Sequence, residues 1–182
     1  MIGLLLGLLR RAGGWRPRLR PPTPDAAELR RDLERVLHDG PALRTSALAL
    51  ELGLLAVTVT DPCQRDRVEA AQHTVRLVLD DLRQVGEALY PPVLPGAGIE
   101  PALRSVAERH GLALTLDVVA AGLGADARSR TCLLVADHLR SLHPDTAVAV
   151  RVRAGRHLIR VRITEDRPGA APRRHWAVLR CA

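Results

Sequence analysis

One stretch near the N-terminus decides how this chain folds: Leu29-Arg30-Arg31-Asp32-Leu33-Glu34-Arg35-Val36-Leu37-His38-Asp39-Gly40-Pro41-Ala42-Leu43. Its apolar residues continue along the chain at alternating spacings of three and four, which is typical of a long helix that packs against another helix. The pattern predicts a first helix from about Asp25 to Val59. Its apolar positions form a first seam, made of Leu29, Leu33, Val36, Leu43, Ala47, Leu50 and Leu54.

A second heptad pattern follows the turn signal Asp61-Pro62 and ends at Tyr90-Pro91-Pro92, where two prolines stop a helix. Two long helices joined by a short turn form an antiparallel hairpin, and two hairpins packed as a four-helix bundle bury apolar positions that one hairpin leaves wet. We therefore expect a homodimer. The alternative is that the hairpin buries these apolar positions by packing against the C-terminal domain. The second seam comprises Val68, Ala71, Val75, Val78, Leu82, Val85 and Leu89.

The rest of the chain alternates shorter helical and strand patterns. The fold class predicted is α+β: a long antiparallel helical hairpin followed by a small α/β sandwich with helices on one face of a sheet. The domains expected are a disordered linker over 1–24, the hairpin over 25–92 and the sandwich over 93–182. Within the sandwich we expect helices at 101–110 and 126–143, and strands at 112–119, 147–153, 156–164 and 175–181.

Composition narrows the class of function. The formal net charge is +7, and all 27 basic residues are arginines that are spread along the chain among 20 acidic residues. Nucleic-acid binding needs a clustered basic face, so the sequence predicts no nucleic-acid partner. The three cysteines are far apart and odd in number, which argues against a disulfide framework and favours a cytoplasmic location.

The apolar run Met1–Leu9 is too short for a spanning helix and lacks the flanks of a signal peptide. We expect a loosely packed or disordered tail without membrane contact. Residues 10–24 are rich in Arg, Pro and Gly, which is typical of an extended linker.

His38 is the residue whose position suggests chemistry. If Leu33 is an a position of the heptad, His38 falls at f, on the solvent side farthest from the first seam. Asp39 follows it directly, and Gly40-Pro41 is an unfavourable pair for a helix interior, costing about 1 kcal/mol for Gly and about 3 kcal/mol for Pro relative to Ala. A sequence tolerates such a local conflict more readily where local shape serves a function.

A neutral imidazole that faces solvent can accept a phosphoryl group carried by another protein. Asp39 can orient the ring and take up its proton, and Arg35 and Arg44 can hold the phosphoryl oxygens electrostatically. The remaining histidines are weaker candidates for a functional site. His138 and His143 are five apart on one helix, which is not the spacing of a helical zinc pair, so the sequence predicts no metal site.

The motif Leu37-His38-Asp39-Gly40 resembles the phosphoacceptor helix of bacterial sensor histidine kinases whose box reads Leu-His-Asp. The later stretch Leu89-Tyr90-Pro91-Pro92-Val93-Leu94 resembles the exit of the second helix into the ATP-binding domain of that family. The resemblance extends over about residues 28–165. It implies that His38 is the phosphoacceptor, that Asp39 is its acid–base partner, and that the C-terminal domain is a reduced histidine-kinase ATPase domain.

Three departures from the family pattern stand out. Leu43 lies four residues after Asp39, where the family often has an amide side chain that positions water for dephosphorylation. The helix around Asp137 lacks the family's Mg²⁺-binding Asn. After the strand that ends near Thr164, the glycine-rich adenine loop is reduced to Glu165-Asp166-Arg167-Pro168-Gly169, in which Pro168 and Arg167 replace flexible positions.

These departures predict a degenerate kinase domain and an architecture like that of dimeric histidine phosphotransferases. The main hypothesis is a phosphorelay protein that carries a phosphoryl group on His38, with no cofactor of its own and with Mg²⁺ supplied by a response-regulator receiver domain. One alternative is a minimal active kinase that binds ATP-Mg²⁺ through Asp137, Ser141 and Asp166. A second alternative is a dimeric scaffold with no catalytic role, which binds a signalling partner while His38 is inert.

Overall fold

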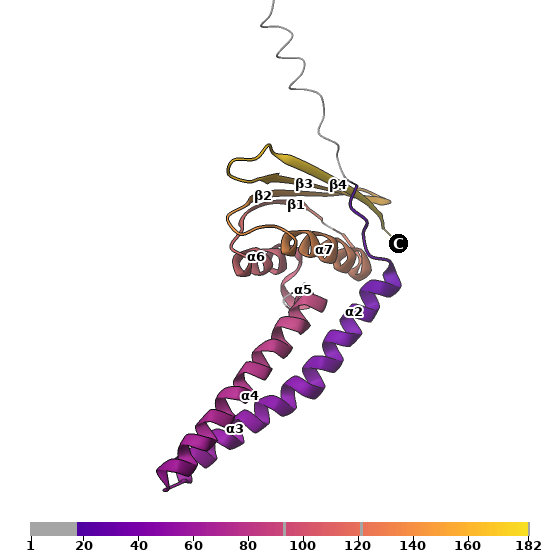
Figure 1. The fold of residues 1–182 in the computed structure, drawn as a ribbon. Helices are drawn as coiled ribbons and strands as arrows, with labels where there is room; N and C mark the ends of the chain where they lie inside the picture. The colour runs from indigo at the N-terminus through magenta and orange to yellow at the C-terminus, as the bar shows by residue number, and fades with distance from the viewer. Residues whose placement is uncertain (1–17, 93, 121, 182) are drawn as a thin grey trace, which may run out of the picture. The chain divides into compact units, whose positions relative to one another are not determined.

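A computed structural model describes residues 18–92, 94–120 and 122–181 (Figure 1). It contains two compact units. One is the continuous stretch Asp25–Pro92, and the other combines the residues before that stretch with those after it. The α+β fold class predicted from the sequence is confirmed: a long helical region is followed by a small mixed sheet with helices.

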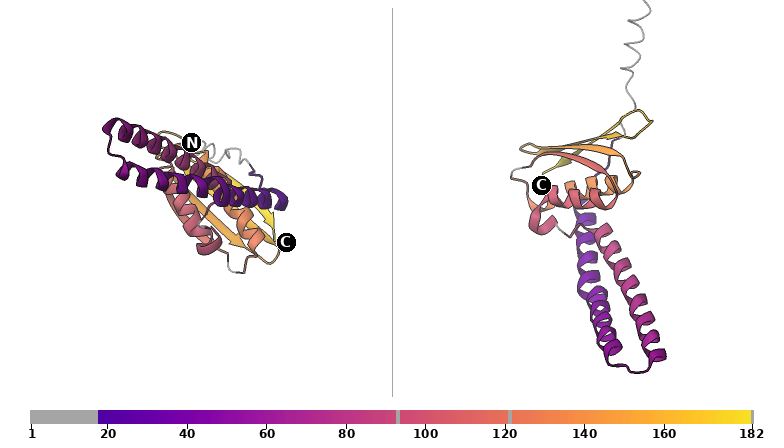
Figure 2. Two further views of the ribbon diagram at one scale, coloured as in Figure 1. Left: turned by 90° about the horizontal axis from the view of Figure 1, so that it is seen from below. Right: turned by 90° about the vertical axis from the view of Figure 1, so that its left-hand side faces the viewer.

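The first unit is the predicted helical hairpin. Its first arm runs without interruption through α2 (Pro24–Leu37), the short π-helix η1 (His38–Ala42) and α3 (Leu43–Thr58), and its second arm is α4 (Pro62–Leu89). Asp61 caps α4 by accepting a hydrogen bond from the backbone N–H of Cys63 at 2.9 Å. Beyond Leu89 the chain leaves the helical conformation at Tyr90, and Pro91 follows. Both views show α3 and α4 lying side by side (Figures 1 and 2).

The two arms pack through small and polar residues rather than through the first seam. The side-chain amide of Gln72 on α4 donates to the carbonyl of Ala49 at 3.3 Å and lies over Gly53. Gly86 of α4 similarly accommodates the side chain of Leu37. The leucines and valines of the first seam are instead exposed by 45% to 68%. They are Leu29, Leu33, Val36, Leu43, Leu50 and Leu54.

The second unit is an α/β sandwich with one four-stranded sheet, in the order β1-β2-β3-β4. Strands β1 and β2 are parallel, and β2, β3 and β4 are joined by antiparallel pairing. Helices α6 and α7 cover one face of this sheet (Figure 2). The elements are α5 (Leu94–Ala97), α6 (Ile99–Arg109), β1 (Ala113–Val119), α7 (Ala125–Arg140), β2 (Ala147–Ala154), β3 (Leu158–Asp166) and β4 (Arg173–Arg180).

Alternation along the strands builds the core of the sandwich. In β2 the residues Val148, Val150 and Val152 are buried while their neighbours are exposed, and β3 continues the same pattern. Successive side chains of a strand point to opposite faces, so one face packs against the helices and the other carries polar residues. The order helix, strand, helix, strand, strand, strand is as the sequence predicts, with the short helix α5 as an addition.

Residues Arg18 to Thr23 differ from the disordered linker expected there. Arg18 forms a β-bridge with Trp176 of β4, and the N–H of Leu19 donates to the carbonyl of Trp176 at 2.9 Å. The guanidinium of Arg130 on α7 donates to the carbonyl of Pro22 at 2.9 Å. This segment is extended, as its prolines predict, but its backbone groups are bonded to the sandwich. The apolar run Met1–Leu9 lies outside the described residues.

Candidate functional site

His38 is the first residue of the π-helix η1. The N–H of Leu43 donates to the carbonyl of His38, a bond that spans five residues instead of the four of an α-helix. Pro41 lies within this turn and has no N–H of its own to donate. Gly40-Pro41, the pair that is unfavourable in a helix interior, thus lies in a distorted part of the first arm, and the distortion is a single widened turn rather than a break.

The imidazole of His38 projects into solvent. Its side chain is 75% exposed, and that of Asp39 is 68% exposed. The Nδ1 atom of His38 lies 3.1 Å from Oδ1 of Asp39, which is its sole side-chain partner among the residues the structure describes. When Asp39 is ionised, this hydrogen bond requires the proton to be on Nδ1, so the lone pair is on Nε2. The arrangement gives a solvent-facing nucleophilic nitrogen.

Two arginines lie on either side of His38 along the first arm. Arg35 forms an ion pair with Asp32 at 3.4 Å, and both side chains are more than half exposed. Arg44 is exposed and has no ion pair with any described residue. The exposed ion pair between Arg35 and Asp32 contributes little to stability, so an incoming anion can replace Asp32 as the partner of Arg35. The guanidinium groups of Arg35 and Arg44 are therefore both available to such an anion.

A second cluster of polar side chains lies between helix and sheet in the other unit. Nε2 of His138 on α7 is 2.7 Å from Oε1 of Glu165 on β3, and Nε2 of His175 on β4 is 2.5 Å from the same oxygen. The two imidazole centroids are 4.5 Å apart. All three side chains are only 10% or 11% exposed. A carboxylate oxygen is thus held between two imidazoles, largely out of contact with water.

The hydrogen bonds of this cluster are incomplete. The contact between His138 and Glu165 is a hydrogen bond, but the closer approach of His175 lacks hydrogen-bond geometry, and neither ring nitrogen of His175 has a partner. Leaving one such buried polar group unsatisfied costs about 1–3 kcal/mol. Burial lowers the pKa of His138, assisted by the nearby His175 and opposed by Glu165, which favours the neutral imidazole.

The sequence did not single out this cluster, although one signal for it exists. The inward face of β3 runs Ile159, Val161, Ile163 and then Glu165, so the alternation places a carboxylate at a core position. Charged residues are rarely buried without partners, and a position of this kind points to a partner elsewhere. Pairing of Ile163 with His175 in the neighbouring strand supplies one.

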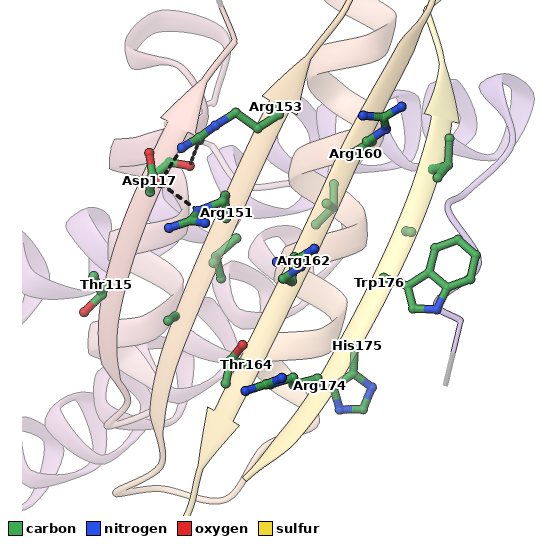
Figure 3. Close-up of a pocket in the computed structure, with 15 residues that line it drawn as sticks. Thr115, Asp117, Arg151, Arg153, Arg160, Arg162, Thr164, Arg174, His175 and Trp176 are labelled. Carbon is green, nitrogen blue, oxygen red and sulfur yellow. Dashed lines mark hydrogen bonds and ion pairs between the residues drawn. The ribbon is translucent and has the colours of Figure 1, made fainter. Parts of the chain in front are cut away.

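The open face of the sheet carries a shallow cavity of about 960 Å³ lined by arginines (Figure 3). Asp117 of β1 accepts hydrogen bonds from Arg151 and Arg153 of β2. The guanidinium of Arg153 lowers the pKa of Asp117, with Arg151 contributing less, and Asp117 in turn raises the pKa of Arg153. Arg160, Arg162 and Arg174 form no ion pair with a described residue, so this face of the sheet is solvated and basic.

Comparison with known proteins bears on the hairpin. Residues 30–94, about a third of the chain, match a protein-family model described as histidine kinase. This part of the chain is therefore similar to histidine kinases. The match contains His38, Asp39 and both arms of the hairpin. No curated protein matches the chain.

The histidine kinase match gives the hairpin a functional class. A segment of this family supports phosphotransfer signalling of the histidine-kinase type within a two-component system. Such segments typically dimerise and pair with response regulators. The resemblance stated from the Leu-His-Asp motif and the exit at Pro91-Pro92 is therefore confirmed over the hairpin.

The three residues expected to hold ATP in an active histidine kinase lie on α7, at its C-terminal cap and at the end of β3. Asp137 forms an ion pair with Arg140 at 3.2 Å, and Ser141 donates its hydroxyl hydrogen bond to the carbonyl of His138. Asp166 is exposed at the end of β3. Their assignment as nucleotide ligands stays a prediction of the active-kinase alternative.

The first arm of the histidine kinase segment also passes a simple test for a membrane span. Within the described residues, the helical stretch Pro24–Thr58 is long and apolar enough to cross a membrane, and none of its apolar window is buried. A single helix of this kind is weak evidence for a span, because core helices of soluble proteins and signal sequences pass the same test.

Proposed function

We propose that this protein is a phosphorelay component of a two-component system, which accepts a phosphoryl group on His38 from a response-regulator aspartate or passes it to one. One observation carries the proposal: the exposed His38–Asp39 pair lies within the histidine kinase segment. A phosphoacceptor must be reachable by a second protein, and the π-turn presents this ring away from the contacts between the arms.

The chemistry follows from the tautomer that Asp39 selects. The lone pair of Nε2 attacks the phosphorus of an aspartyl phosphate, and the new N–P bond forms as the acyl-phosphate P–O bond breaks. The receiver carboxylate leaves with the electron pair, while Asp39 stabilises or takes up the Nδ1 proton. The receiver domain supplies Mg²⁺, which neutralises charge on the phosphoryl oxygens, and Arg35 and Arg44 add positive charge from this chain.

Loss of ATP binding is the second part of the proposal. By the resemblance to histidine kinases, His138 and Glu165 lie in or beside the two stretches expected to hold the nucleotide, and here they bond to each other in a buried cluster with His175. The helix α7 has no Asn for Mg²⁺, and Pro168 stiffens the loop that follows β3. These features support a domain that no longer takes a nucleotide, and the phosphoryl group must then come from another protein.

Dimerisation through the first seam completes the proposed assembly. The exposed leucines of α2 and α3 form a stripe that a monomer leaves in water, whereas a second hairpin buries it in a four-helix bundle. His38 is at the heptad position farthest from this stripe and stays accessible in the dimer. We place the assembly in the cytoplasm, where response regulators are found.

Radiolabelled ATP with Mg²⁺ tests the loss of kinase activity. The purified full chain is incubated with the nucleotide, and acid-labile label on the protein is measured. No label is expected. Robust labelling that His38→Gln abolishes and His73→Gln retains would show an active kinase and overturn the second part of the proposal. His73 is the matched control because it is an exposed histidine on the other arm.

Transfer from receiver domains tests the first part. A panel of receiver domains charged with radiolabelled acetyl phosphate is mixed with the full chain. Label is expected on the chain, lost in His38→Gln and kept in His73→Gln. Absence of transfer from every receiver, together with normal partner signalling by His38→Ala, would favour the scaffold alternative.

A further inference from the structure

We propose that His138, Glu165 and His175 form a binding site for one divalent transition-metal ion, with Zn²⁺ as the best-matched probe. Each residue offers one donor atom, and the three donor atoms lie within 4.8 Å of one another. The ion would join α7 to β3 and β4 inside the sandwich. The site shares no residue with the His38 site, so the inference goes beyond the proposed function and does not depend on it.

The geometry of the three side chains suits a metal after a small adjustment. The imidazole nitrogens of His138 and His175 are now 2.7 and 2.5 Å from the same carboxylate oxygen. Around tetrahedral Zn²⁺ with ligands at about 2.0–2.2 Å, neighbouring donor atoms are about 3.4 Å apart. Moving each nitrogen away from the oxygen by about 1 Å, through rotation of side chains, opens the centre of the triangle.

The unsatisfied ring of His175 is the independent observation that points to a ligand. Its side chain is 89% buried, and neither of its nitrogens has a hydrogen-bond partner despite the close approach to Glu165. Buried polar groups in proteins are nearly always bonded, so a group without a partner calls for a missing one. An ion at the centre of the cluster would accept the lone pair of His175 and separate three donors that now crowd one another.

The donor set selects the class of ion. Two imidazoles and one carboxylate suit Zn²⁺ and related transition metals, whereas Mg²⁺ and Ca²⁺ prefer an all-oxygen set. Both imidazoles must be neutral to coordinate, and burial favours that form at His138. Three protein ligands leave a fourth position for water. Cys132 on α7 is not among the three donors, so sulfur is not expected at the ion.

Stoichiometric zinc binding by the full chain tests the site. Metal-free protein, prepared with a chelator that is then removed, is titrated with ZnCl₂ against a competing chromophoric chelator. One Zn²⁺ per chain is expected, together with a rise in the thermal unfolding temperature. His138→Gln and His175→Gln should each weaken binding by more than about 100-fold, since even residues that only support a ligand change metal affinity by about 10–100-fold.

Two matched variants separate this site from other zinc-binding groups. His143→Gln removes an exposed histidine just beyond α7, and His38→Gln removes the proposed phosphoacceptor. Both should bind Zn²⁺ like the wild type, whatever the outcome of the phosphotransfer experiments. Equal binding by the wild type and the His138 or His175 variants, or no binding by the wild type, would overturn the proposal.

If the His138 and His175 variants do not fold, X-ray absorption on the zinc-loaded wild type still identifies the atoms that bind the ion. The spectrum should show nitrogen and oxygen ligands with the outer-shell scattering of two imidazoles. A sulfur ligand at the bound ion would place it at a cysteine and refute the assignment.

Discussion

At the scale of single residues, the reactivity of each cysteine thiol measures how deeply that thiol is buried. Burial raises the pKa of the Cys132 thiol to about 12, an effect that Arg140 opposes and Asp137 reinforces, while Cys63 is exposed. The thiolate is the reactive form, so we expect iodoacetamide at neutral pH to modify Cys63 rapidly and Cys132 only after unfolding. Mass mapping of the alkylated peptides measures both.

Cys63→Ser is the control for that experiment. It should remove the fast-reacting site and leave Cys132 protected in the folded chain. Rapid modification of Cys132 without denaturant would mean that α7 does not pack as described.

Asp117 gives a residue-scale prediction about pH. Its pKa lies below the ordinary value of 3.8, chiefly because Arg153 donates a hydrogen bond to the carboxylate. The stabilising pair is therefore complete above pH 3.8 and is lost as the pH falls through the lower folded-state pKa. A carboxyl titration by NMR should show the depressed value, and Arg153→Gln should bring it back toward 3.8.

The matched variant for Asp117 is Arg160→Gln on the same face of the sheet. The pKa of Asp117 is lowered by Arg153 and Arg151 and not by Arg160, so this variant should leave the titration nearly unchanged. An equal shift in both variants would indicate a general effect of net charge instead of the specific hydrogen bond.

At this scale the sequence predicted the exposure of His38 and missed the cluster of His138, Glu165 and His175. His38 could be placed in solvent because its heptad position depends only on neighbours along one helix. The buried cluster joins residues from α7, β3 and β4, and their meeting depends on strand register that local patterns do not determine. Spacing on a single helix led to the expectation of no metal, and that expectation stays untested.

At the scale of elements, two glycines inside the first helical arm give a prediction about stability. A Cβ at Gly40 in η1 would meet nothing within 4 Å, whereas a Cβ at Gly53 in α3 would lie 2.8 Å from the amide nitrogen of Gln72. Gly40→Ala should raise the free energy of unfolding by about 0.5–1 kcal/mol. Gly53→Ala should gain little, because Gln72 must move and lose its bond to Ala49, worth about 1 kcal/mol.

Urea denaturation of both glycine variants measures the difference. Equal stabilisation would show that the arms of the hairpin are not in contact at Gly53. Destabilisation by Gly40→Ala would show that the π-turn requires glycine's backbone freedom.

The ends of elements were the easiest features to predict. Asp61-Pro62 and Tyr90-Pro91-Pro92 fixed the limits of α4, because a capping carboxylate begins a helix and a proline ends one. The short helix α5 and the bonding of residues 18–23 were not predicted. Both lie in proline- and glycine-rich sequence, where local propensity is low and tertiary contacts decide the conformation.

Oligomeric state is the prediction for the whole molecule. Replacing Leu50 and Leu54, exposed leucines of the first seam, with Glu places two charges in the proposed dimer interface. Burying unpaired charges is strongly unfavourable, so the double variant should elute as a monomer while the wild type elutes as a dimer. Light scattering coupled to size-exclusion chromatography gives the mass of each.

Gln64→Glu is the control for the dimer experiment. It adds charge at an exposed position near the start of α4, before the second seam begins. This variant should remain a dimer. A monomeric wild type would contradict the proposal and leave the exposed seam to another partner.

The segment around Leu19 bears on how the chain avoids unwanted association. β4 is the last strand in the sheet order, and an uncovered edge strand offers its free N–H and C=O groups to any extended chain nearby. Arg18 and Leu19 occupy part of that edge through the bridge to Trp176. A shortened version starting at Pro24 would keep every named helix and strand and still be more prone to aggregate, because the residues that cover part of the β4 edge would be missing.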